Sequence, residues 1–263
     1  MNVGDDSAAR ESAERFDHAL RASALREEAS HATPFDLGEL WRDLASGRCK
    51  VADSFHSEAR CYLVLVPASA GGSHRRRPNP RSLHVLERLL LEGSQKRLAL
   101  SLGVSTSTIA GVAKACLFGM GLGCSPSKVP PLLVMAAHAE HGQGSFGDAR
   151  SSELFGANSW FRLISATRPD RDLKDLLSSA ELAVARLLVD GESHAEIARL
   201  RGSSRRTVAN QLAAVFQRLG VSGRADLLRV LSVGRAACEP ANGNARALPL
   251  ERAEPQNSAQ LSP

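Results

Sequence analysis

The stretch that decides the fold of this chain is SHAEIARLRGSSRRTVANQLAAVFQRLG, residues 193–220. Ser193 and Glu196 form a capping box, in which the two residues satisfy each other's free backbone N–H groups at the start of a helix. The pattern predicts a helix of about two turns, a sharp turn at Gly202 and a longer helix over residues 205–219. A short helix, a glycine turn and a longer helix are the helix-turn-helix arrangement.

Two further helices complete this unit. Ser178 and Glu181 form a second capping box, which opens a helix that ends at Gly191. Ser222 caps a fourth helix after the long one. The sequence therefore predicts a four-helix unit over residues 177–232.

The long helix is amphipathic, and its two sides differ in chemistry. Large apolar residues recur at helical spacing on the inner side, namely Val208, Leu212, Val215 and Leu219. The opposite side carries Arg206, Ala209, Asn210, Ala213 and Gln217. The major groove of B-DNA admits one α-helix, asparagine can pair bidentately with adenine there, and small side chains can touch the thymine methyl group. The outer side therefore predicts a helix that reads duplex DNA.

The charge of this unit favours the same partner. Residues 177–232 contain eight arginines and five acidic residues, a net charge of +3. Arg205, Arg206 and Arg218 lie near the ends of the long helix, where guanidinium groups can meet phosphates. The whole chain of 263 residues carries +5, which permits an anionic partner without requiring one.

A family resemblance rests on four groups of residues: Leu177-Ser-x-x-Glu181, Gly191-x-Ser193-x-x-Glu196-Ile-Ala198, Ser204-x-x-Thr207-Val208 and Leu219-Gly-Val-x-x-Arg224. At this spacing they closely resemble the LuxR/GerE-type helix-turn-helix of bacterial transcription regulators. The resemblance implies a four-helix DNA-binding domain whose third helix enters the major groove and whose fourth helix is often used for dimerisation. It also implies a function, the sequence-specific regulation of transcription through double-stranded DNA.

Carried over by position, the resemblance places three residues against bases: Ala209, Asn210 and Ala213. The predicted phosphate contacts are Ser204, Arg205, Arg206, Thr207, Gln211, Gln217 and Arg218. The chain departs from the family pattern in the turn, where Arg201 and Ser203 replace a leucine and an aliphatic residue. In the recognition helix, Gln211 stands where histidine is common, and Ala209 and Ala213 replace frequent basic residues. These departures bear on affinity and sequence preference more than on the fold.

The upstream half repeats the order of these features at a shift of 99 residues. The matched pairs are Ala59–Val66 with Asn158–Ser165, Leu98-Ala99 with Ile197-Ala198, Gly103 with Gly202, Thr108-Ile109 with Thr207-Val208, and Gly121 with Gly220. The alignment of the two halves needs a one-residue gap near Gly93 and Gly191, and a second gap restores the shift of 99 residues. A repeated supersecondary unit predicts two copies of one fold. We therefore predict a mainly α fold with two small β-hairpins, arranged as tandem hairpin-plus-helix-turn-helix units.

Each half begins with two strand-like segments. They are Lys50–Phe55 and Arg60–Val66 in the first half, and residues 152–155 and 159–165 around Gly156-Ala157-Asn158 in the second. An isolated two-stranded hairpin is marginally stable in water. We hypothesise that the two hairpins pair with each other, or that each packs on its own helical unit.

The first helical unit is a degenerate copy of the second. Pro80 suits the first turn of a helix. The candidate DNA-facing residues are Ser105, Thr106, Ser107, Thr108 and Lys114, with fewer cations than in the second unit. Three roles stay open, namely a second DNA contact, a pseudo-dimer partner for the second unit, and a surface for sensing or protein binding. If both units read DNA, one chain could span two half-sites about one helical turn apart.

The predicted domain plan has four parts: a disordered or weakly helical segment over residues 1–34, the first unit over 35–140, the second over 150–232, and a disordered tail over 233–263. The five cysteines are scattered and lack zinc-finger spacing. No apolar run is long enough to span a bilayer, and the acidic N-terminus differs from a signal peptide. We expect a cytoplasmic protein that does not bind membranes.

Two other classes of function compete with the regulator. The first is an adaptor that binds RNA polymerase or another regulator, since LuxR-type units look like region 4 of bacterial sigma factors. The second is an enzyme, which is disfavoured because no acid, base and nucleophile converge. His138 and His141 have metal-compatible spacing but no third ligand, so we expect no metal and no cofactor. Besides double-stranded DNA, the alternatives for a partner are RNA polymerase, a second copy in a homodimer, and an intramolecular pseudo-dimer.

Overall fold

The computed structural model of the protein describes residues 21, 32–68, 78–144, 146–155 and 160–233. Three predictions fall wholly or largely outside these residues: the character of the N-terminal segment 1–34, the turn at residues 156–158 and the tail 233–263.

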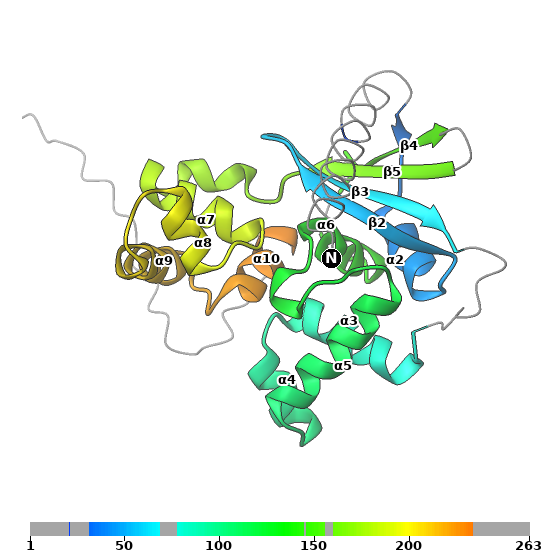
Figure 1. The fold of residues 1–263 in the computed structure, drawn as a ribbon, viewed down its shortest axis with the longest axis horizontal. Helices are drawn as coiled ribbons and strands as arrows, with labels where there is room; N and C mark the ends of the chain where they lie inside the picture. Colours follow the sequence, from blue (N-terminus) through cyan, green and yellow to red (C-terminus); the bar gives the residue numbers. More distant parts are fainter. Residues whose placement is uncertain (1–20, 22–31, 69–77, 145, 156–159, 234–263) are drawn as a thin grey trace, which may run out of the picture.

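A single antiparallel sheet contains both predicted hairpins (Figure 1). Its strands are β1 (Thr33–Pro34), β2 (Cys49–His56), β3 (Arg60–Pro67), β4 (Arg150–Phe155) and β5 (Trp160–Thr167), in the order β1-β4-β5-β3-β2. The hairpins join where β3 pairs with β5, so the hypothesis that they pair is confirmed. The predicted helices and both hairpins are present, but the fold is mixed α/β and not mainly α, because the hairpins join with β1 into one five-stranded sheet. Pairing satisfies the inner edges of both hairpins, which would otherwise expose unpaired backbone groups.

The sheet is apolar on both faces at its centre. Leu63 and Leu65 of β3 belong to the main core, whereas Tyr62 and Val64 form a second cluster with Leu163 of β5. This alternation follows from the period of two along a strand. Helices α2 (Leu37–Ala45) and α6 (Pro131–Glu140) pack together and contribute to the main core.

The first helical unit begins with a helix at Pro80, as predicted. It comprises α3 (Pro80–Glu92), α4 (Gln95–Leu102) and α5 (Thr106–Gly119), followed by the short 3₁₀ helix η1 (Pro126–Lys128). The side chains of Ser94 and Ser105 cap α4 and α5, and Gly93 and Gly103 end α3 and α4 in the left-handed conformation. Figure 1 shows this unit as a lobe below α6.

The second helical unit follows the 3₁₀ helix η2 (Arg171–Asp175). It comprises α7 (Ser179–Val189), α8 (His194–Leu200), α9 (Arg205–Leu219) and α10 (Arg224–Val233). Both predicted capping boxes are present, at the starts of α7 and α8. The predicted inner side of α9 is buried, namely Val208, Leu212, Val215 and Leu219. In Figure 1, α7, α8 and α9 lie at one end of the molecule, and α10 lies between them and α6.

No single helix in the described part of the chain is long and apolar enough to cross a membrane. Helices α4 and α5 reach the required length and composition only as a pair bent by 107°.

Candidate nucleic-acid interface

The start of α9 is built to meet an anion. The Ser204 hydroxyl accepts a hydrogen bond from the Thr207 backbone N–H at 3.0 Å and lies 2.9 Å from the Thr207 hydroxyl. The first turn carries no acidic residue, and Arg205 and Arg206 are exposed there. Neither arginine has a hydrogen bond or ion pair with any described residue. The partial positive charge of the helix N-terminus adds to theirs.

The outer side of α9 is open. Ala209, Asn210 and Ala213 are all exposed, on the side opposite the buried apolar residues. Gln217 is exposed one turn further along, and Gln211 is half-buried beside them. The structure therefore brings the three predicted base-facing residues onto one accessible strip, although their contacts with bases stay a prediction.

Arg218 differs from the other predicted phosphate contacts because it already has a partner. Its Nη1 atom lies 2.8 Å from Oε2 of Glu181, the capping-box residue of α7. Hydrogen bonds from Ser178 and the charge of Arg218 lower the pKa of Glu181, so this carboxylate is ionised at neutral pH. The ion pair ties the end of α9 to the start of α7 and leaves half of the Arg218 side chain exposed.

Helix α8 and the turn after it brace α9 from behind. Arg201, which replaces the leucine common in the family, donates a hydrogen bond of 2.7 Å to the Ala180 carbonyl of α7. Sequence reasoning treated Arg201 only as a departure, because a contact to a backbone carbonyl 21 residues away leaves no sequence pattern. Hydrogen bonds from Ser193 lower the pKa of Glu196 to about 2, and Lys128 Nζ lies 3.5 Å from the same carboxylate.

Most acidic side chains of the second helical unit form ion pairs with basic side chains. The charges that remain without an opposite partner near α9 are therefore mostly positive. Glu181 pairs with Arg218, Glu196 with Lys128, Asp226 with Arg229, and Asp190 with Arg168. Arg199, Arg205 and Arg206 have no such acidic partner among the described residues. The net positive charge predicted from composition is therefore available at the surface around α8 and the start of α9.

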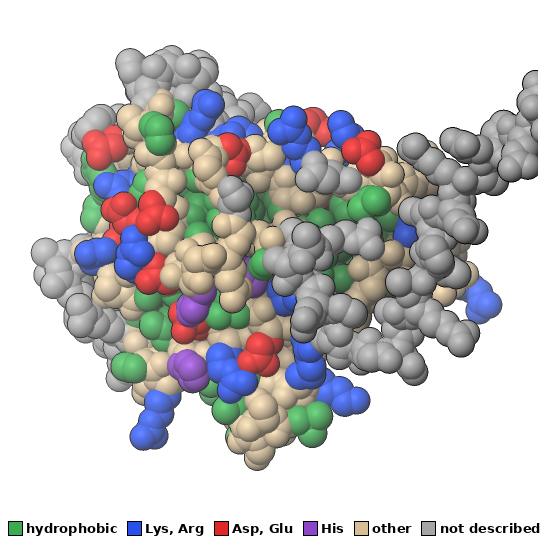
Figure 2. Space-filling model, turned by 180° about the vertical axis from the view of Figure 1, so that it is seen from behind, with side chains coloured by type: hydrophobic (Ala, Val, Ile, Leu, Met, Phe, Trp, Pro, Cys, Tyr) green, Lys and Arg blue, Asp and Glu red, His purple; other side chains and the backbone are tan. Residues whose placement is uncertain are grey.

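The corresponding surface of the first unit is polar, with one cation on the helix. Thr106, Ser107 and Lys114 are exposed on α5, and the Ser105 hydroxyl lies 2.7 Å from that of Ser107 and 2.8 Å from that of Thr108. Exposed Lys96 and Arg97 stand at the start of α4. Figure 2 shows Lys and Arg side chains on the lower lobe, which α3, α4 and α5 form. These residues lie apart from the strip on α9.

A buried ionic cluster connects the sheet to α7. Arg168 at the end of β5 pairs with Asp170 at 2.9 Å and with Asp190 at 2.8 Å, and Arg186 of α7 lies 3.2 Å from Asp170. His56 of β2 lies 3.2 Å from Asp190, the residue that ends α7. Burial raises the pKa of Asp190, against the opposing charge of Arg168. This cluster was not predicted, since its members lie on different elements and one of them, His56, is more than 100 residues from the others.

Arg224 forms a second connection between the two helical units. Its guanidinium donates to the carbonyls of Leu188 and Val189 at the end of α7, at 2.7 and 2.8 Å. It also donates to Ser127 and Val129, ahead of α6, at 2.9 and 2.8 Å. Burial lowers the pKa of Arg224 to about 10, so the group stays charged at neutral pH. Arg224 is part of the family pattern, and the structure gives it a role as the link between α7 and the first unit.

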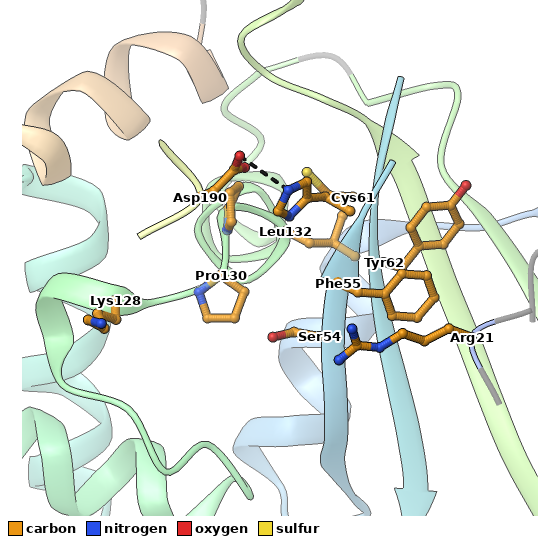
Figure 3. A pocket seen from close by; sticks show the side chains of 11 residues that line it. Arg21, Ser54, Phe55, Cys61, Tyr62, Lys128, Pro130, Leu132 and Asp190 are labelled. Atoms are coloured by element: carbon orange, nitrogen blue, oxygen red, sulfur yellow. Dashed lines mark ion pairs between the residues drawn. The ribbon is translucent and has the colours of Figure 1, made fainter. Parts of the chain in front are cut away.

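A cavity of about 370 Å³ lies at the same joint (Figure 3). Ser54 of β2 lines one wall, Lys128 and Pro130 line the other, and the His56–Asp190 ion pair borders it. Burial raises the pKa of the Cys61 thiol to about 12, so this thiol is protonated at neutral pH. Among the described residues, no three His, Cys, Asp or Glu side chains could hold a metal ion together.

The fold of residues 179–233 and the open side of α9 define a class, the helix-turn-helix DNA-binding domains. Within that class, residues 175–231 match the model of the GerE family, described as bacterial regulatory proteins of the luxR family. These residues are a LuxR/GerE-type helix-turn-helix domain, which implies DNA binding and transcriptional regulation and suggests a regulator rather than an enzyme. Neither the curated proteins nor the solved structures gave a match to the chain.

Proposed function

We propose that the protein is a sequence-specific transcription regulator that inserts α9 into the major groove of duplex DNA. The observation that carries the proposal is the open strip of Ala209, Asn210 and Ala213 on α9, next to two arginines at the helix N-terminus that have no partner among the described residues. Such a protein acts where the bacterial chromosome is, in the cytoplasm.

In this proposal, some side chains of α9 contact bases and others contact phosphates. Asn210 pairs with adenine, and the methyl groups of Ala209 and Ala213 contact the thymine methyl or allow close approach. Contacts with phosphates come from Ser204, Arg205, Arg206, Thr207, Gln211, Gln217 and Arg218, and they fix the position of α9 on the duplex. To contact a phosphate, Arg218 must either leave Glu181 or bind the phosphate and Glu181 at the same time.

We also infer that α3, α4 and α5 are a second, degenerate helix-turn-helix unit of the same type. The support is a constant offset, because α7, α8 and α9 each begin 99 residues after α3, α4 and α5. The caps repeat as well: Ser94 corresponds to Ser193 and Ser105 to Ser204. Gly103 and Gly202 both have positive φ, 64° and 59°. In this unit, Ser105, Thr106, Ser107, Thr108 and Lys114 would face DNA.

Binding selection tests the proposal. Purified full-length protein is incubated with a random duplex pool, and bound sequences are recovered at rising salt concentration. A regulator enriches a defined site, and its affinity falls steeply with salt because phosphate contacts release counterions. Arg206→Ala should reduce the salt slope by about 1 and weaken binding to all sequences alike. A protein that ignores every duplex at low ionic strength is not a DNA-binding regulator.

An adaptor function is the second candidate, and exposed apolar side chains on the first unit favour it. Leu100 of α4 and Phe118 of α5 are 74% and 76% exposed, and apolar side chains of this size could contact a protein partner such as RNA polymerase or another regulator. Replacing Arg205, Arg206 and Asn210 together with alanine separates the two functions. The triple variant should lose specific DNA binding if α9 reads DNA, and should keep partner binding if the protein is an adaptor.

A further inference from the structure

We propose that one chain is a fused dimer: its two helical units are related by a pseudo-two-fold axis and bind, as a single polypeptide, a duplex with two inverted and unequal half-sites. This inference rests on the proposed DNA-binding function. It adds the stoichiometry of the complex and the form of the DNA site.

The first support is the register of the central strand pair. β3 and β5 are antiparallel, and Val64 pairs with Leu163. These two residues are 99 apart, the offset that relates the two units. In an isologous interface, a residue near the symmetry axis contacts its own counterpart, and contacts on either side occur in reciprocal pairs. The β3–β5 register has this property, so the hairpins pair as two copies would across a two-fold axis.

The second support comes from the helices. Gly93, which ends α3, lies against α10, because a Cβ built on it would be 2.9 Å from the Asp226 Cα. Gly191, in the turn after α7, lies against the segment ahead of α6, and a Cβ built on it would be 3.6 Å from the Lys128 Cα. Each of the two glycines therefore contacts the other unit near its last helix. The exchange is approximate, because Asp226 lies within α10 whereas Lys128 precedes α6.

The third support is the packing of α6 against α10, the last helices of the two units. Leu227 and Leu228 of α10 are 0% and 1% exposed within a single chain. The apolar side of α10 is thus covered by the chain's own helices. A second copy could reach it only by displacing α6 or α3.

The symmetry sets the form of the DNA site. A two-fold axis between the units turns α5 and α9 in opposite directions, so their half-sites are inverted. The half-sites are unequal, because α9 offers Asn210 with Arg205 and Arg206, whereas α5 offers hydroxyl groups and the single cation Lys114. We expect one strong half-site under α9 and one weak half-site under α5, about one helical turn apart.

The test uses the full-length chain and the duplex recovered by selection. The mass of the complex in solution gives the number of chains per duplex, and footprinting maps the contacted phosphates. We expect one chain per duplex and protection of two inverted segments. Lys114→Ala should remove protection from the weak segment only and reduce the salt slope by about 1. Arg150→Ala, which removes an exposed arginine on β4 in the sheet, is the matched control and should change neither.

The outcomes separate this inference from the proposed function. Two chains on a symmetric site would show a homodimer and overturn the fused dimer, while DNA binding would stand. One chain that protects a single segment, or a Lys114→Ala footprint equal to that of the unchanged protein, would also overturn it. Failure to bind any duplex would instead refute the DNA-binding function itself.

Discussion

Replacing Arg224 with methionine should loosen the joint between the two helical units. The substitution keeps the length of the side chain but removes the donors to four carbonyls, those of Ser127, Val129, Leu188 and Val189. The Ser127 carbonyl is exposed and can turn to water, whereas the other three hydrogen bonds are partly buried. At about 1 kcal/mol for each of these three, we expect the free energy of unfolding to fall by about 3 kcal/mol. For a protein of this size that corresponds to a decrease in Tm of about 6–12 °C.

Urea unfolding followed by circular dichroism measures this loss. The midpoint should fall with an unchanged slope if the native state is otherwise intact. Arg199→Met is the matched control, since Arg199 is exposed and has no hydrogen-bond or ion-pair partner among the described residues, and it should stay within about 0.5 kcal/mol of the unchanged protein. Equal midpoints for Arg224→Met and Arg199→Met would refute the role given to Arg224.

Three further predictions address recognition, pH and packing. Asn210→Ala should leave stability within about 0.5 kcal/mol but lose about 1–3 kcal/mol of discrimination at one base pair, measured by competition with the four base variants; an equal loss at every position would contradict base readout. Hydrogen bonds from Ser193 hold the pKa of Glu196 at about 2 against an ordinary 4.5, so its stabilising effect is present above pH 4.5 and lost as pH falls toward 2. The unchanged protein should therefore lose stability relative to Glu196→Gln across that window, and parallel curves would count against the capping box. Leu163→Ala should cost about 2–5 kcal/mol because Leu163 is 1% exposed, whereas Leu200→Ala, at an exposed site, should cost far less; similar costs would contradict the second apolar cluster.

Local signals were sufficient to predict the helices. A capping serine and a glycine with positive φ fix where a helix begins and ends, and these residues act within one turn. For this reason α8 and α9 could be located from Ser193 and Ser204. The open side of α9 could be predicted for the same reason, because helical periodicity assigns each residue to a side.

The sheet and the joints could not be predicted in this way. Two antiparallel hairpins are compatible with several pairings, and the choice of β3–β5 depends on contacts about 100 residues apart. Arg168, Asp190 and His56 meet only after that sheet has formed, so their charges carried no signal in the sequence. Arg201 and Arg224 donate hydrogen bonds to backbone carbonyls. Because every residue has a backbone carbonyl, the sequence does not indicate which one an arginine will bind. These contacts nevertheless decide how the DNA-binding unit is held.

Helix α6 connects the parts that sequence reasoning treated as separate units. Leu132, Leu133, Ala136 and Ala137 are all fully buried, and the helix is apolar on every side, as expected for an element surrounded by protein. It packs on α2 and β3 at the sheet and on α3 and α10 in the helical units. Because α6 and α10 are covalently linked through the same chain, their contact is intramolecular and does not depend on protein concentration, unlike that of an obligate dimer. The proposed fused dimer would therefore keep its two recognition helices in fixed relation at dilutions where two separate chains would part.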